Sequence, residues 1–269
     1  MIRQVRSLTS PIFCSTIWFA DIRNSERMDS MYKFYQLLTS SDYSKAIVTY
    51  NKRDCLYAMY LYIISFAIAT TFVLVRRIFG FTFVIFIPSM FLIILLVFVF
   101  VRIRKESAIS IGITKSNLTK SAIMGIVVGA VVLFFLDRGM RIRELFLDSS
   151  TANILFSFFF WFAMVSLSEE LLFRGYIQPR LNGIAKSEIL AVLLGSIMFA
   201  LMHVPTVAVD HLMGISTFEF SLAHIRWLAM LMGFHVLFHI LYRKYNSIVA
   251  PFIVHGFVNL GLILPVLFV

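Results

Sequence analysis

"NILFSFFFWFAMVSLSEELLFRGYIQPRL" (residues 153–181) joins a long apolar run directly to two glutamates and an arginine. The run at 153–165 carries no charged residue and is typical of the interior of a membrane-spanning helix. Glu169, Glu170 and Arg174 follow it within the same stretch. A charged side chain at the centre of a bilayer costs roughly 2.5–3.5 kcal/mol, so charge placed here predicts a functional site.

The whole chain has the composition of an integral membrane protein. It contains 269 residues, of which 60% are hydrophobic and 14% are charged, and its mean hydropathy is +0.89. A soluble domain is nearer half apolar and a quarter charged. The apolar runs are continuous rather than alternating, which favours helices over a transmembrane β-barrel. We therefore predict an all-α fold, a polytopic transmembrane helix bundle of about seven to eight helices.

The segments between the apolar runs predict how the bundle is oriented. Of the 24 lysines and arginines, 18 fall in the segments on one side of the predicted membrane and 6 on the other. Cytoplasmic segments carry the excess of positive charge, so we expect the N-terminus inside and the C-terminus outside. An eighth, shorter or re-entrant segment within 137–150 or 206–224 is an open alternative. The predicted spans are 56–75, 79–101, 121–136, 152–172, 188–204, 225–242 and 247–268.

The composition changes at about residue 54. Residues 1–54 are mixed and basic, and we expect them to form a cytoplasmic or interfacial segment, with the bundle occupying 55–269. The net charge of +10 then reflects membrane topology, and we expect no nucleic-acid partner. Cys14 and Cys55 form no metal-binding or redox pattern.

Three pairs of side chains recur at helical spacing inside apolar runs: Glu170 with Arg174, Phe199 with His203, and His255 with Asn259. Residues four apart share one face of a helix. Glu169 points about 100° away from Glu170, free to address a different partner. Since lipid contact is costly for each polar group, we expect these faces to converge in the bundle interior.

Each pair also has a purely structural interpretation. Glu170 and Arg174 could form an ion pair at a helix end, and His203 could end its helix before Pro205. His255 and Asn259 could be the interhelical hydrogen-bonding groups that are common in membrane bundles. His235 and His239 are also four apart, but no polar partner is evident, and we assign them to packing or to an interface.

The ordered set EExxxR, FxxxH and HxxxN resembles the type II CAAX prenyl endopeptidase family and its bacterial relatives, the CPBP (Abi) intramembrane glutamate endopeptidases. The resemblance covers about 151–262 well and 108–136 loosely, so a core of about 108–265 is expected. It implies that Glu169 and His203 activate a water molecule and that His255 and Asn259 form an oxyanion hole. Glu170, Arg174 and Phe199 are then supporting residues.

The resulting expectation is an intramembrane peptidase in the lipid bilayer, and we place it in the cell membrane of a prokaryote. Its substrate would be a lipidated or membrane-embedded peptide or protein, and its cavity would open to the cytoplasm. Burial makes a carboxylate a better base, which suits Glu169 to activating water. We expect no metal cofactor, because the HExxH pattern is absent and Asn259 is a poor zinc ligand; a zinc site formed by the glutamate and the histidines is the alternative.

Two other functions compete with this one. The same scaffold could act without catalysis, as an immunity protein against a bacteriocin or as a partner of a sensor or cell-envelope enzyme. Intramembrane glutamate and histidine could also serve a proton-coupled transporter. No inverted repeat and no broken helices are evident in the sequence, which argues against the transporter.

Overall fold

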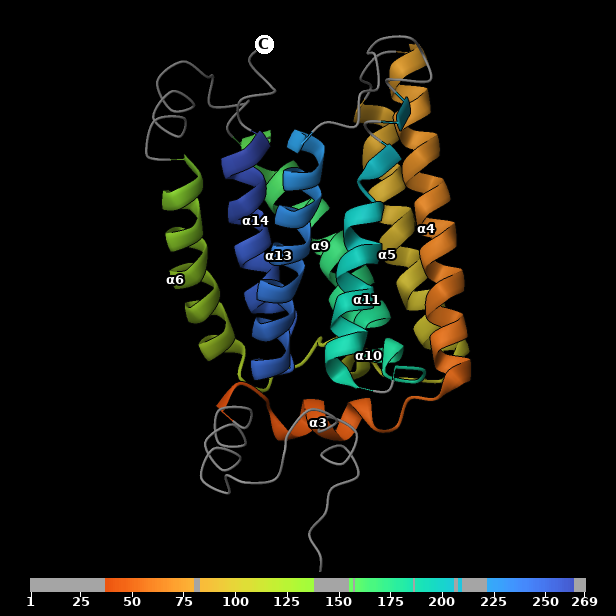
Figure 1. Cartoon of the computed structure of the whole chain (residues 1–269), viewed down its shortest axis with the longest axis vertical. Coiled ribbons are helices and arrows are strands. Elements are labelled where there is room, and N and C mark those ends of the chain that lie inside the picture. Colours follow the sequence, from red (N-terminus) through yellow and green to blue (C-terminus); the bar gives the residue numbers. More distant parts are fainter. Residues whose placement is uncertain are drawn as a thin grey trace, which may run out of the picture.

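The computed structural model describes residues 37–79, 83–137, 155–156, 158–185, 187–205, 208–209 and 222–263. Within these residues the chain is a bundle of long helices, as predicted (Figure 1). Six of them are α4 (Lys52–Phe79), α5 (Phe83–Ile103), α6 (Leu118–Asp137), α11 (Glu188–Leu201), α13 (Leu222–Tyr245) and α14 (Val249–Ile263).

The seventh long helix runs through the middle of the bundle, and we call residues 158–181 the central helix. It combines α9 (Ser166–Glu170) and α10 (Gln178–Leu181) with two wider, π-helical segments, η2 (Phe158–Val165) and η3 (Leu171–Ile177). Its neighbours include α4, α5, α11, α13 and α14. Wide turns of this kind occur most often at functional sites, because they re-aim side chains and free backbone carbonyls.

The outer helices present apolar side chains outward. α4, the residues 118–136 of α6, and α13 are long and apolar enough to cross a membrane, and at most a third of the apolar window of each is buried. The stretches 87–103, 188–201 and 249–261 are shorter apolar helices. Exposed apolar side chains such as Leu95, Phe134 and Ile189 suit contact with lipid. The chain is a multi-pass membrane protein.

One end of the bundle is covered by a short helix, α3 (Ser41–Ile47), which lies across it (Figure 1). The backbone N–H of Ser40 donates to the Arg243 carbonyl at the end of α13, at 3.0 Å, and the Ser40 side chain caps α3. Residues at this end include the basic side chains Lys52, Arg104, Lys115, Lys120, Arg243 and Lys244. By the positive-inside rule, this excess of positive charge predicts that the α3 end faces the cytoplasm.

α6 packs closely on α14 because small residues line their contact. A Cβ at Gly129 would lie 2.2 Å from the Phe257 ring, and one at Gly125 would lie 3.0 Å from the Ala250 carbonyl oxygen. Between membrane helices, close approach of this kind gives van der Waals stabilisation that the surrounding lipid does not already provide.

The central helix differs from the predicted span 152–172. The helix continues to Leu181, so Glu169 and Arg174 lie well inside it rather than at its cytoplasmic end. The prediction placed the end too early because it treated Arg174, Gln178 and Arg180 as solvent-facing. All three side chains are instead fully buried by protein partners. The alternative segments at 137–150 and 206–224 fall largely outside the described residues.

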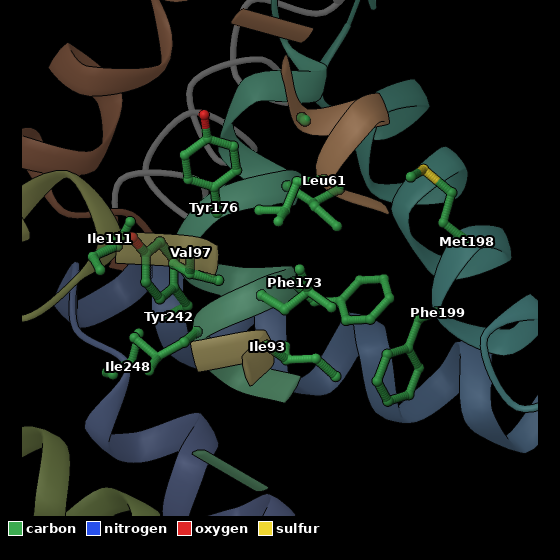
Figure 2. Close-up of a cluster of buried hydrophobic side chains, with 14 of the residues drawn as sticks. Leu61, Ile93, Val97, Ile111, Phe173, Tyr176, Met198, Phe199, Tyr242 and Ile248 are labelled. Atoms are coloured by element: carbon green, nitrogen blue, oxygen red, sulfur yellow. The ribbon is translucent and has the colours of Figure 1, made fainter. Parts of the chain in front are cut away.

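The largest apolar cluster gathers around the π-helical part of the central helix (Figure 2). Phe173 and Tyr176 of this segment meet Leu61 of α4 and Val97 of α5. Every residue from Leu171 to Leu181 is buried. This dense packing holds the polar residues of the same helix in fixed positions.

Candidate active site

Three helices bring two glutamates and two histidines together. Glu169 and Glu170 come from α9, His203 follows the end of α11, and His255 lies on α14. The Glu169 carboxylate oxygen Oε2 lies 3.6 Å from His255 Nε2 and 3.9 Å from His203 Nε2. Residues that are far apart in sequence thus face one another across the bundle interior.

The hydrogen bonds of the histidines define their tautomers. His203 Nδ1 lies 2.9 Å from the Phe199 carbonyl oxygen, which can only accept, so Nδ1 carries the hydrogen. His255 Nδ1 lies 2.7 Å from Glu170 Oε1, and with Glu170 ionised it too donates. In the neutral rings both Nε2 atoms therefore direct a lone pair toward Glu169.

The distances from Glu169 Oε2 to the two Nε2 atoms, 3.6 and 3.9 Å, are too long for direct hydrogen bonds. This spacing suits a water molecule, which can donate a hydrogen to the carboxylate and another to an imidazole. Glu169 is partly exposed, with a relative side-chain exposure of 22%. The arrangement is therefore able to bind and deprotonate a water molecule.

Glu170 has a different environment from Glu169. Its Oε1 accepts from His255 and lies 3.0 Å from Arg174 Nη1, and neither side chain of this ion pair is exposed. The guanidinium of Arg174 lies between two aromatic rings, 4.6 Å from the Phe199 centroid and 4.8 Å from the Phe238 centroid. Aromatic faces on both sides stabilise the buried cation.

This packing explains the position of Phe199 in the FxxxH pair. The Phe199 ring touches the arginine, and its carbonyl oxygen orients His203. Phe238 plays a comparable part and was missed by the sequence reasoning. Its ring stacks on His255 with centroids 4.9 Å apart and an interplanar angle of 23°. Phe238 lies in an apolar helix where no pattern distinguishes it from a lipid-facing phenylalanine.

Asn259 lies near the candidate site, but its side-chain amide already donates two hydrogen bonds. Its Nδ2 donates to the Trp161 carbonyl oxygen at 3.2 Å and to Ser166 Oγ at 3.0 Å. Ser166 Oγ in turn donates to the same carbonyl at 3.2 Å. The π-helical segment η2 contains this carbonyl, and wide turns leave such groups available to side chains. Trp161 and Ser166 were also missed: Trp161 stands in a uniformly apolar run, and no spacing pattern links Ser166 to Asn259.

The prediction that His235 and His239 lack polar partners was wrong. His235 Nε2 lies 2.9 Å from Gln178 Oε1, and His239 Nε2 lies 3.4 Å from Glu188 Oε1. A side chain at Gly195 would put its Cβ 1.9 Å from Gln178 Oε1, so glycine is needed where this bond forms. The partners come from α10 and α11, and sequence spacing within α13 could not indicate them.

Two further features bear on the chemistry. Among the described residues, no group of three or more histidines, cysteines, aspartates and glutamates has an arrangement suited to holding a metal ion. A cavity of about 390 Å³ lies at the α3 end, where its lining includes Asp42, Tyr50, Glu106 and Tyr242. This cavity contains none of the converging glutamates and histidines, so we assign the candidate site from their chemistry.

Comparison with known proteins adds one finding. Residues 151–261 match the family model of the type II CAAX prenyl endopeptidase Rce1-like proteins. The matched segment contains Glu169, His203, His255 and Asn259. No curated protein and no solved structure gave a match.

Proposed function

Because residues 151–261 belong to the type II CAAX prenyl endopeptidase family, we propose that this chain is an intramembrane peptidase whose Glu169 activates the attacking water. One observation carries the proposal: the Glu169 oxygen Oε2 lies 3.6 and 3.9 Å from the Nε2 atoms of two histidines and makes no hydrogen bond. No metal ion is needed for the proposed steps.

In the first step Glu169 removes a proton from water, and the oxygen attacks the carbonyl carbon of the scissile peptide bond. General-base assistance of this kind contributes typically 10²–10⁴-fold to the rate. The carbonyl oxygen becomes an oxyanion. When the carbon–nitrogen bond breaks, the proton held by Glu169 passes to the leaving amine, and a carboxylic acid and an amine are released.

His255 is proposed to stabilise the oxyanion, and the Glu170 carboxylate supports this role. In its neutral form the ring presents a lone pair at Nε2, which cannot donate. A proton taken up from solvent at Nε2 before the reaction gives an imidazolium, which donates to the oxyanion and keeps this proton throughout, while the Glu170 carboxylate at Nδ1 interacts with its charge. The ion pair with Arg174 then holds this carboxylate in place.

Asn259 is proposed to supply a second N–H donor to the oxyanion. Its amide currently donates to Trp161 and Ser166. Ser166 Oγ has its own bond to the Trp161 carbonyl, so it can release the amide when substrate binds. Loss of one oxyanion donor typically costs about 10²–10³-fold in kcat.

The substrate is proposed to be a lipidated or membrane-embedded peptide or protein, and the location the cell membrane of a prokaryote. The proposal for the substrate rests on the apolar helices around the site and on the family match, and the proposal for the location rests on the resemblance to the bacterial relatives.

The test compares membrane-peptide profiles from cells that carry the wild type, the Glu169→Gln variant or no protein. Glu169→Gln preserves the size of the side chain and removes the base. Wild-type and variant protein must be present at equal levels in the membrane. Peptides cut only in the wild type would support the proposal. If the variant matches the wild type while deletion changes the cell, the non-catalytic regulator is favoured instead.

A further inference from the structure

The candidate site is not equally accessible from its two ends. Glu170 and Arg174 are completely buried, whereas the side chains of Glu169 and His203 are 22% and 25% exposed. His203 lies beyond the last residue of α11, and α11 begins at the α3 end. The partly exposed His203 therefore lies toward the end of the bundle away from α3.

Toward the α3 end the central helix is closed off by protein. Every residue from Leu171 to Leu181 is buried. His235, His239 and Tyr242 of α13 are buried beside this stretch. Figure 2 shows Tyr176, Ile111, Tyr242 and Ile248 gathered in the same packed region.

The packing in this region leaves little space. A Cβ at Gly175 would lie 2.9 Å from the Ile111 carbonyl oxygen, and a Cβ at Gly112 would lie 2.5 Å from the Tyr242 ring. The cavity at the α3 end stops short of the site. Its lining on the central helix is Pro179, which lies ten residues along the chain from Glu169.

The distribution of charge identifies the closed end as cytoplasmic. The described basic residues at the α3 end are Lys45, Lys52, Arg53, Arg102, Arg104, Lys105, Lys115, Lys120, Arg243 and Lys244. Those of the described residues at the opposite end are Arg76, Arg77 and Arg226. An imbalance of this size orients a membrane protein with the α3 end inside.

We propose that substrate reaches Glu169 from the non-cytoplasmic side, so that the peptidase cuts an exported peptide or the outer-leaflet part of a membrane protein. The proposal rests on the peptidase function above and replaces the cytoplasmic opening expected from the sequence. Two aromatic rings lie near His203: the centroid of Phe199 is 5.0 Å away and that of Trp227 is 6.1 Å away. An apolar peptide segment therefore suits this approach better than a charged one.

Thiol labelling in membrane vesicles tests the direction of access. Cys14 is replaced by serine, and the buried Cys55 is retained as the background. Glu169→Cys and His203→Cys are then treated separately with a membrane-impermeant cationic methanethiosulfonate. Right-side-out and inside-out vesicles are compared. Arg77→Cys and Lys115→Cys report the two ends of the bundle, since both residues are exposed.

We expect Glu169→Cys and His203→Cys to react at least tenfold faster in right-side-out vesicles, as Arg77→Cys does. Lys115→Cys should show the opposite preference. Faster reaction at the site in inside-out vesicles, equal rates from both sides, or no reaction from either side would overturn the proposal. An inverted pattern for the Arg77 and Lys115 controls would overturn it as well, because the α3 end would then be outside.

The labelling result does not depend on catalysis. The proteolysis test with wild type and Glu169→Gln is made on separate samples. Access from the outer side together with unchanged proteolysis in Glu169→Gln would reject the peptidase function and leave the direction of access intact. Loss of proteolysis together with cytoplasmic labelling would reject only the direction.

Discussion

Two groups of buried charge in this bundle are built differently. At the α3 end three carboxylates have a direct cationic partner: Asp54 pairs with Arg104, Glu106 with Arg180, and Glu188 with Arg243. In the candidate site Glu170 is paired in the same way, but Glu169 is not. Its buried oxygen Oε2 makes no direct hydrogen bond, although two imidazoles face it.

The difference separates charge that holds the bundle together from charge that is available for a reaction. A paired buried carboxylate has its lone pairs occupied, and breaking the pair leaves a charge without compensation. A carboxylate at 3.6–3.9 Å from its neighbours has room for a water molecule and a substrate. Mutations at the two kinds of carboxylate should therefore affect different measurements.

The largest effect on activity is expected for Glu169→Gln. Removing the general base should lower kcat by at least about 10³-fold, toward the upper part of the usual range for such groups. The midpoint of thermal unfolding in detergent should stay within a few degrees of the wild type, because Glu169 has no direct partner. Purified protein in proteoliposomes, tested on a peptide identified from the membrane profiles, provides the rate. If the thermal midpoint of Glu169→Gln falls as far as it does when an ion pair is broken, Glu169 has a structural role.

The largest effect on stability is expected for Arg174→Met. The change leaves the buried Glu170 carboxylate without its cation and should cost about 3–5 kcal/mol of unfolding free energy. The double variant Glu170→Gln/Arg174→Met is the matched control, since it removes both charges. It should regain most of the stability but not the activity, because His255 loses the carboxylate at Nδ1. Full activity in the stable double variant would contradict the role given to Glu170.

Glu106→Gln should show the opposite behaviour from Glu169→Gln. It weakens the partner of the fully buried Arg180 at the α3 end, and we expect a loss of about 1–3 kcal/mol in stability. The turnover per folded molecule should not change. Differential scanning fluorimetry and single-turnover proteolysis on the same preparation check both values. A tenfold loss of turnover would show that the α3-end charges take part in the reaction.

A smaller effect is expected for Phe238→Leu. The variant keeps the site apolar but removes the ring that stacks on His255 and covers one face of Arg174. Such aromatic contacts are worth about 0.5–1.5 kcal/mol, which corresponds to a fall of up to about tenfold in kcat. Phe234→Leu on the same helix is the control, because the Phe234 ring stacks on the Phe238 ring. Equal losses of kcat in both variants would show that Phe238 contributes only to packing of the helix and has no specific effect on His255.

No effect is expected from a strong zinc chelator such as 1,10-phenanthroline. The proposed steps use only the carboxylate, the imidazoles and the amide of the site. The assay compares the rate before treatment, after treatment and after zinc is added back. Loss of activity that zinc restores would identify Glu169, His203 and His255 as ligands and replace the metal-free mechanism.

Much of the fold follows from local pattern. Continuous apolar runs separated by basic segments correctly predicted a helical membrane bundle, and most predicted spans agree with the helices to within a few residues. The exception is the central helix. A stretch that contains glutamate, arginine and glutamine looks like a helix end in sequence, but protein partners bury these groups and the helix continues to Leu181.

The candidate residues were chosen from spacing, and the bundle brings Glu169, His203 and His255 within reach of one another. The roles given to them stay predictions. His235 and His239 show that spacing alone does not identify a site, because they are four residues apart just as the site pairs are. Their partners Gln178 and Glu188 lie more than fifty residues away in sequence, and no pattern within α13 points to them.

By itself, the sequence determined that this chain crosses the membrane and that charge inside its helices needs a polar interior. Both conclusions depend on composition and period, which are local properties. Only the tertiary structure decided which carboxylate is paired and which is free. It also decided which way each imidazole presents its lone pair and which end of the site is closed. Those properties depend on distances between helices, and such distances are set by packing rather than by neighbours along the chain.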